Sequence, residues 1–178
     1  MFNRRIWSHL VVITALVSSS CSSMSKTTTV PTMTTIYVVR HAEKLTTDFD
    51  TPLSPAGEQR AQALAEQLAE AGVQRIYATQ RQRTQQTVAP LAARLKLEVV
   101  VLEPNAVDSL VQRIKREDSG HVVLVAGHNN TVPAIVQGLA GQPVDAIPEH
   151  VFDRLYRVQL PDQGPATVAV LNYGVPTP

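Results

Sequence analysis

The sequence predicts an α/β fold, a three-layer sandwich in which helices flank a mostly parallel central sheet. Short apolar runs typical of strands alternate with stretches of helical periodicity, and this alternation favours a mostly parallel sheet. About 140 residues carry the pattern, a usual length for one domain with its own core. We expect strands at 35–39, 74–78, 97–102, 122–125, 155–160 and 167–171, and helices at 55–70, 83–95, 106–116 and 132–139.

The first predicted helix has the clearest boundaries. Ser54 is placed to cap its N-terminus, and Pro55 suits the first helical position. Leu64 and Leu68 repeat at the spacing of one helix face, and Gly72 marks the end.

A proline inside a predicted helix and the last two predicted strands both bear on the regularity of the fold. Pro90 falls inside the second predicted helix, where its missing N–H predicts a kink or an interruption. The strands predicted at 155–160 and 167–171 close the domain, and we expect them to include an antiparallel edge.

The N-terminus has the pattern of a secretory signal. Arg4 and Arg5 supply a positive start, and residues 6–17 form an apolar stretch too short to span a bilayer comfortably. Cys21, the only cysteine, resembles the acylated cysteine of a bacterial lipoprotein, although Ser18 stands where leucine or valine is usual. A plain signal peptide or an uncleaved anchor gives a similar profile.

This pattern divides the chain into three parts. We expect residues 1–20 to be a signal peptide, 21–33 a lipidated N-terminus with a flexible tether, and 34–178 the folded domain. The lipid on Cys21 would hold the protein on a membrane of the bacterial cell envelope, facing the periplasm. Without residues 1–20, 14 basic residues (16 less two arginines) face 15 acidic ones, a formal charge of −1. Nucleic-acid binding therefore has no electrostatic support.

Two histidines mark the candidate site. His41 and His128 each follow an apolar strand-like run at the point where it stops. Because ligands bind outside the carboxyl ends of parallel strands, the two can converge although they are far apart in sequence. Arg40 lies beside the first histidine, and Arg83 follows another short strand-like run.

Two arginines and two histidines suggest a phosphate pocket. Guanidinium groups match phosphoryl oxygens bidentately and stay charged at any working pH. A neutral His41 could act as a nucleophile that forms a covalent intermediate. His128, when protonated, would donate to the oxygens on which charge builds. We expect neither a metal nor a cofactor.

Four ordered segments resemble the motifs of the histidine phosphatase superfamily, also called the phosphoglycerate-mutase-like family. They are Arg-His-Ala at 40–42, Leu-Ser-Pro-Ala-Gly-Glu-Gln-Arg-Ala at 53–61, Arg-Thr-Gln-Gln-Thr at 83–87 and Gly-His-Asn-Asn-Thr at 127–131. An ordered set is far more specific than a lone Arg-His pair. The resemblance covers roughly residues 34–172 and implies a phosphoglycerate-mutase-like fold. It also implies that His41 is the nucleophile and that Arg40, Arg83 and His128 bind phosphate.

Three positions vary from this family pattern. Thr79 stands where a serine is usual, and Arg81 stands where a leucine is common, so Arg81 would face solvent or extend the site. Asn129 takes the place of an aspartate that is the general acid in some related enzymes. An amide cannot protonate a leaving alkoxide, so that version of the mechanism is excluded.

Three carboxylates are then candidates for the role of general acid. Glu103 lies in the interval where other relatives place a glutamate, Asp108 is a second candidate, and Glu43 is close to the nucleophile. A phosphoramidate or an aryl phosphate demands less proton donation than a sugar alkoxide, so phosphohistidine hydrolysis also stays open.

We expect a metal-independent phosphohydrolase that works through a covalent phosphohistidine on His41. Its substrate would be an extracytoplasmic phosphomonoester, a phosphorylated small molecule or sugar. A phospholigand-binding module without turnover is one alternative. Another is a metal site built from His41, Glu43, His128 and His150, although the two arginines would repel a cation. The chain carries no G-x-S-x-G elbow and no P-loop.

Overall fold

The computed structural model describes residues 32–177. The predicted signal peptide, Cys21 and all but the last two residues of the predicted tether lie outside this range. Among the described residues, no helix combines the length and the apolar character needed to cross a membrane.

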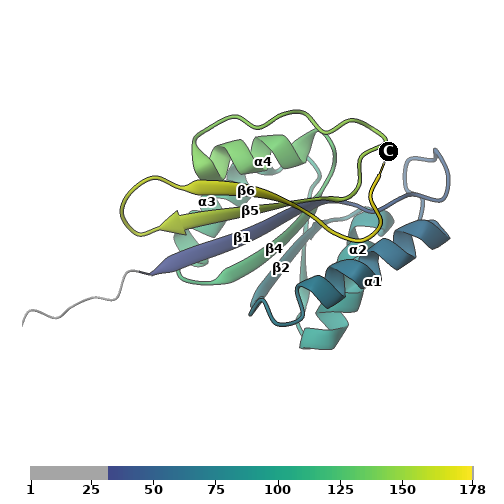
Figure 1. Ribbon diagram of the computed structural model, residues 1–178, viewed down its shortest axis with the longest axis horizontal. Helices are drawn as coiled ribbons and strands as arrows, with labels where there is room; N and C mark the ends of the chain where they lie inside the picture. Colours follow the sequence, from purple (N-terminus) through teal and green to yellow (C-terminus); the bar gives the residue numbers. More distant parts are fainter. Residues whose placement is uncertain (1–31, 178) are drawn as a thin grey trace, which may run out of the picture. The chain divides into compact units, whose positions relative to one another are not determined.

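A six-stranded sheet forms the centre of the described residues (Figure 1). Its strands in chain order are β1 (Met33–Arg40), β2 (Arg75–Thr79), β3 (Val99–Leu102), β4 (Val122–Gly127), β5 (Arg154–Pro161) and β6 (Thr167–Asn172). Across the sheet the order is β3-β2-β4-β1-β5-β6. The first four strands in this order are parallel, whereas β5 runs antiparallel to β1 and β6 antiparallel to β5. The predicted α/β fold with an antiparallel edge is confirmed.

Four helices cover the two faces of the sheet. They are α1 (Pro55–Gln67), α2 (Gln82–Leu95), α3 (Val107–Glu117) and α4 (Thr131–Ala140). The first two pack together on one face, and the last two pack together on the other (Figure 1). This arrangement gives the three predicted layers.

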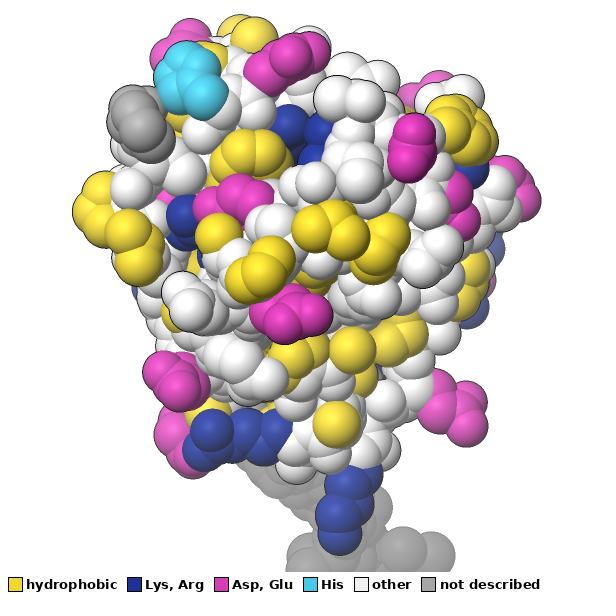
Figure 2. Space-filling view, turned by 90° about the vertical axis from the view of Figure 1, so that its right-hand side faces the viewer, with side chains coloured by type: hydrophobic (Ala, Val, Ile, Leu, Met, Phe, Trp, Pro, Cys, Tyr) yellow, Lys and Arg dark blue, Asp and Glu magenta, His cyan; other side chains and the backbone are white. Residues whose placement is uncertain are grey.

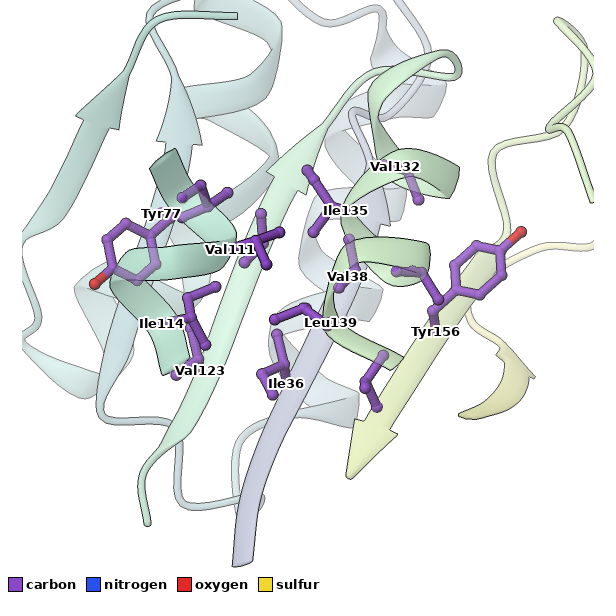
Figure 3. Close-up of a cluster of buried hydrophobic side chains, with 14 of the residues drawn as sticks. Ile36, Val38, Tyr77, Val111, Ile114, Val123, Val132, Ile135, Leu139 and Tyr156 are labelled. Atoms are coloured by element: carbon purple, nitrogen blue, oxygen red, sulfur yellow. The ribbon is translucent and has the colours of Figure 1, made fainter. Parts of the chain in front are cut away.

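Alternation along β1 supplies both faces of the core, because successive strand residues point to opposite sides. Ile36 and Val38 belong to the cluster on the α3 and α4 side, and Val39 belongs to the cluster on the α1 and α2 side. Figure 3 shows the first cluster, with these labelled side chains of the helices: Val111, Ile114, Val132, Ile135 and Leu139. β1 is therefore buried on both faces, and its end is held firmly.

The start of α1 is tied to the loop that follows β1. The Oγ atom of Ser54 accepts a hydrogen bond from the amide of Gly57 at 3.2 Å, as expected of an N-cap. The amide of Ser54 in turn donates to the carbonyl of Glu43 at 2.9 Å. A Cβ atom on Gly57 would collide with that same carbonyl oxygen. Glycine at this position thus allows the helix to approach the residues just beyond His41.

Of the two outcomes predicted at Pro90, a kink or an interruption, the interruption does not occur, because α2 is continuous from Gln82 to Leu95. Proline costs a helix one hydrogen bond and some steric strain. Val88 and Leu91, on either side of it, are completely buried against the sheet. Tertiary packing of this face outweighs the local preference of Pro90.

Candidate active site

The pairing of β1 with β4 brings the two histidines together. Arg40 and Gly127 are register partners at the ends of the two strands, and the amide of His41 donates to the carbonyl of Gly127 at 2.9 Å. The rings of His41 and His128 lie edge to face, with centroids 5.4 Å apart and an interplanar angle of 65°. Both side chains therefore border one point beyond the sheet.

His41 is arranged as a neutral base with one free nitrogen. Its Nδ1 lies 2.8 Å from the carbonyl oxygen of Ala42. Because a carbonyl only accepts, Nδ1 carries the proton, and the lone pair is on Nε2. Burial, together with the charges of Arg40 and Arg83, lowers the pKa of His41 to about 3. The imidazole is therefore neutral at pH 7, with a lone pair on Nε2, and competent as a nucleophile.

Arg40 is fixed by the segment that precedes β5. Its Nη1 donates to the carbonyl oxygens of Pro148, Glu149 and Val151 at 3.1, 2.7 and 3.0 Å. Its guanidinium carbon lies 4.0 Å from the centre of the Phe152 ring. These contacts hold the guanidinium in one orientation beside the histidines.

Arg83 extends from the first turn of α2. Its Nη1 donates to the carbonyl of Phe49 at 2.8 Å, so the loop between β1 and α1 helps to hold it. The Nε atoms of Arg83 and Arg40 are buried without a hydrogen-bond partner in the described part of the chain. Burial lowers the pKa of both groups from the usual value of arginine, yet both stay charged near neutral pH. Two desolvated guanidinium groups suit an oxyanion.

His128 is held by two threonines. Its Nε2 lies 3.0 Å from Oγ1 of Thr79, and its amide donates to Oγ1 of Thr131 at 2.9 Å. Burial, and then the charges of Arg83, Arg81 and Arg40, lower the pKa of His128 to about 4. His128 is thus neutral at pH 7 in the free protein and would need to gain a proton to act as the donor that the sequence analysis describes. A bound dianion would raise this pKa again.

Gly127 and the start of α4 shape the floor of the site. A Cβ atom on Gly127 would lie 2.9 Å from Oγ1 of Thr131, the atom that accepts from the amide of His128. Glycine is therefore needed for that bond. α4 begins at Thr131, so its N-terminal dipole adds positive potential close to His128.

These side chains border an open cavity of about 600 Å³ at the end of β1, β2 and β4. Figure 2 shows this side of the domain, with basic side chains recessed among hydrophobic, acidic and polar ones. The lining residues are Arg40, His41, Lys44, Phe49, Gln80, Arg81, Arg83, Glu103, Pro104, Asn105, His128, Asn129, Asn130, Thr131, Glu149 and Phe152. All four predicted phosphate-pocket residues are among them.

The three candidate acids are placed very differently. Glu103 lines the cavity, and Asp108 does not. Glu43 forms an ion pair with Arg60, whose Nη2 and Nε lie 2.7 and 2.9 Å from Oε1 of the carboxylate. That pairing turns the carboxylate of Glu43 toward α1. Glu149 is a second carboxylate of the cavity that the sequence analysis missed.

The alternative metal site does not form as a cluster. Glu43 is occupied by Arg60, and it is absent from the cavity that holds His41 and His128. Within residues 32–177, no three His, Cys, Asp or Glu side chains gather in a way that would hold a metal ion.

Sequence reasoning also missed the residues that support the pocket. The segment 148–152 carries no motif, yet its carbonyl groups and Phe152 position Arg40. Thr79 was noted only as a substitute for serine, and the structure adds its bond to His128. The one available signal was its place at the end of a predicted strand.

Comparison with known protein families finds one match, to part of the chain. Residues 36–104 match the family model described as histidine phosphatase superfamily (branch 1). This segment carries three of the four motifs, and the motif around His128 lies beyond it. No curated protein sequence matches significantly.

Solved structures match over a longer part of the chain. The protein histidine phosphatase SixA, solved with tungstate, is 21% identical with a TM-score of 0.62, covering 78% of this chain and 96% of its own. A mycobacterial glucosyl-3-phosphoglycerate phosphatase is 15% identical with a TM-score of 0.65, covering 80% and 100%. YhfR of Bacillus stearothermophilus is 17% identical with a TM-score of 0.63, covering 77% and 96%. The described residues therefore have the fold of the histidine phosphatase superfamily, and residues 36–104 have its sequence pattern.

Proposed function

We propose that this protein is a metal-independent phosphatase that hydrolyses phosphomonoesters through a covalent phosphohistidine on His41. The observation that carries the proposal is the state of that side chain. His41 is buried and neutral, its Nδ1 is committed to the Ala42 carbonyl, and its free Nε2 faces a cavity shared with Arg40, Arg83 and His128.

In the first step, the lone pair of His41 Nε2 attacks phosphorus and the bond to the leaving oxygen breaks. The ring becomes cationic, and its Nδ1–H continues to donate to Ala42, which stabilises the charge. Arg40 and Arg83 neutralise the equatorial oxygens. The leaving oxygen takes a proton from Glu103, from Glu149 or from water.

In the second step, water attacks the phosphorus atom of the phosphohistidine. The bond from phosphorus to Nε2 breaks, and the electron pair returns to the imidazole. One proton of the water passes to the group that gave up its proton in the first step, the other stays on the phosphate, and inorganic phosphate is released. The negative charge of the phosphoryl group raises the pKa of His128, which then takes a proton from solvent and donates a hydrogen bond to a phosphoryl oxygen.

We propose an extracytoplasmic phosphorylated small molecule or sugar as the substrate. The signal-like residues 1–20 and the lipobox-like Cys21 support a place on the periplasmic side of a bacterial membrane. The likeness to a glucosyl-3-phosphoglycerate phosphatase supports the substrate class.

A second candidate is hydrolysis of phosphohistidine or another phosphoramidate. Asn129 favours it, because no acid follows the second histidine and a phosphoramidate needs little proton donation. The likeness to SixA, a protein histidine phosphatase, points the same way. A binding module that retains the pocket without turnover is the remaining candidate.

The test is hydrolysis of 4-nitrophenyl phosphate by the full chain in the presence of chelator. We expect turnover that falls by at least about 1,000-fold in His41→Ala, since the nucleophile is removed. His121→Ala is the matched control, because His121 precedes β4 at the opposite end from the cavity. Within residues 32–177 its ring makes a single hydrogen bond, with the Ser119 carbonyl. Phosphate binding by folded wild type without turnover would favour the binding module, and loss of turnover with chelator would overturn metal independence.

A further inference from the structure

Two cations at the rim of the cavity are not used by the phosphate pocket. Arg81 and Lys44 both line the cavity, and within residues 32–177 neither forms an ion pair with a carboxylate. Arg81 is also the N-cap residue of α2, where the helix dipole disfavours a positive charge. A charge at this position calls for a physical explanation.

Arg81 is held in place although it has no acidic partner. Its guanidinium carbon lies 3.4 Å from the centre of the Phe49 ring. Phe49 is itself fastened, since its carbonyl accepts from Arg83 at 2.8 Å. The neighbouring Asp50 accepts from the amide of Gln82 at 2.9 Å through Oδ1. The loop is thus attached to the start of α2 at two points, and the stacked arginine has a fixed platform.

Stacking leaves the hydrogen-bonding edge of a guanidinium open. A ring contacts only the flat face, and the N–H donors point outward in the plane. The side chain of Arg81 makes no hydrogen bond to another described residue, so this edge has donors to offer. An oriented guanidinium edge is well suited to bidentate recognition of a carboxylate or phosphoryl group.

The charge of Arg81 acts on the same space as the pocket. It contributes to lowering the pKa of Arg83 and that of His128. The two carboxylates of the cavity, Glu103 and Glu149, come from other loops, and the charge of Glu149 acts on Arg40. The cavity therefore carries positive charge where Arg81 lies and negative charge near Arg40, where Glu149 lies.

We propose that Arg81, together with Lys44, forms a second anion subsite at the rim of the cavity, beside the phosphate pocket. The preferred substrate would then be a phosphomonoester that carries another anionic group, a carboxylate or a second phosphoryl group. This inference rests on the proposed phosphatase function and narrows its substrate class.

The experiment compares two phosphate esters that differ only in one charge, 4-(carboxymethyl)phenyl phosphate and its amide, 4-(carbamoylmethyl)phenyl phosphate. The methylene group insulates the phenol, so both leaving groups have similar acidity. For the full-length wild type we expect kcat/KM for the acid to exceed that for the amide by about 10-fold at low salt, and the ratio to shrink with added salt. In Arg81→Leu we expect a ratio near one, with kcat/KM for the amide within about twofold of wild type. Lys44→Gln is expected to lower the ratio in part.

A wild-type ratio near one, or a ratio that Arg81→Leu leaves unchanged, would overturn the second subsite while phosphatase activity stands. Binding of the two corresponding phenylphosphonates, measured by calorimetry, tests the subsite without turnover. If neither ester is hydrolysed but the acidic phosphonate still binds about 10-fold more tightly in an Arg81-dependent way, the phosphatase proposal fails and the subsite stands. Equal affinities for the two phosphonates would reject the subsite.

Discussion

The inner pocket and the rim of the cavity are built in opposite ways. Arg40, His41 and His128 are 6%, 4% and 8% exposed, and each is fixed by hydrogen bonds to backbone or threonine atoms near strand ends. Phe49, on the rim, is 74% exposed and belongs to the connection between β1 and α1. The ends of the strands thus hold three of the proposed phosphate-pocket residues, while connecting segments present the side chains proposed to contact the rest of a substrate. We therefore expect catalytic chemistry and substrate choice to be separable by mutation.

The strongest expected effect comes from removing a pocket arginine that also has a structural role. Arg40→Ala should lower kcat/KM by at least about 1,000-fold, since a fixed charge on the phosphoryl group is lost. It should also lower the free energy of unfolding by about 2–4 kcal/mol, because three carbonyl groups lose their donor. Urea unfolding and steady-state kinetics measure the two effects.

Arg83→Ala is the matched comparison for this prediction. Among residues 32–177, the side chain of Arg83 donates one hydrogen bond, to the Phe49 carbonyl. We expect a similar loss of activity with less than about 1 kcal/mol of lost stability. Equal destabilisation by the two substitutions would show that the segment 148–152 does not depend on Arg40.

The next effect concerns a positioning residue behind His128. Thr79→Val removes the hydroxyl 3.0 Å from His128 Nε2 and leaves a buried nitrogen unpaired. Since such a loss costs about 1–3 kcal/mol, we expect kcat to fall by about 10-fold or more with little change in KM. Thr79→Ser keeps the hydroxyl and should restore most of the rate. An equally slow serine variant would assign the effect to packing instead.

A smaller effect concerns the dependence of stability on pH. The pKa of His41 is lowered to about 3 and that of His128 to about 4, from a usual value near 6.5. Below pH 6.5 the unfolded chain binds protons at these positions while the folded chain does not. Stability is therefore lost as pH falls from 6.5 toward 4, by at most about 1.4 kcal/mol per pH unit for each histidine.

This pH dependence is tested by comparing wild type with His41→Gln and, as a control, with His121→Gln. Removing the buried histidine should flatten the slope of unfolding free energy against pH, and removing His121 should leave it unchanged. Denaturant unfolding at several pH values between 4 and 7 gives the slopes. Identical slopes in all three proteins would mean that His41 titrates normally in the folded state.

The smallest effect is expected when a carboxylate of the cavity is replaced and activity is measured with an aryl phosphate. Glu103→Gln and Glu149→Gln should each change its kcat/KM by less than about threefold, because an aryl leaving group needs little proton donation. With an alkyl phosphate, replacing the carboxylate that serves as general acid should lower kcat/KM by about 100-fold. If neither replacement slows the alkyl ester, water is the proton donor and the phosphoramidate candidate gains support.

Local patterns were sufficient to predict the elements and the inner pocket. Apolar runs and caps located the strands and the start of α1 at Ser54, and the strand-end rule predicted that His41 and His128 would meet. These features depend on short segments and on one general property of parallel sheets. The same reasoning also allowed an interruption of α2 at Pro90, which does not occur. The local cost of the proline is exceeded by the packing of Val88 and Leu91.

The rim could not be predicted in this way, because it depends on which segments meet in space. Glu43 is only two residues from His41, yet Arg60 turns its carboxylate away from the cavity. Glu149 is distant in sequence and lines that cavity. No periodicity or motif marks either outcome, since each follows from contacts between α1, the loop after β1 and the segment before β5.

The register of β1 against β4 has a consequence for folding kinetics. Arg40 and Gly127 become neighbours only when two strands from distant parts of the sequence pair, with β2 and β3 formed between them in the chain. Such long-range pairings are slow because a large loop must close before they form. Regain of turnover after dilution from denaturant should therefore lag behind regain of helical signal. A simple activity assay would then report the moment at which the centre of the sheet is assembled.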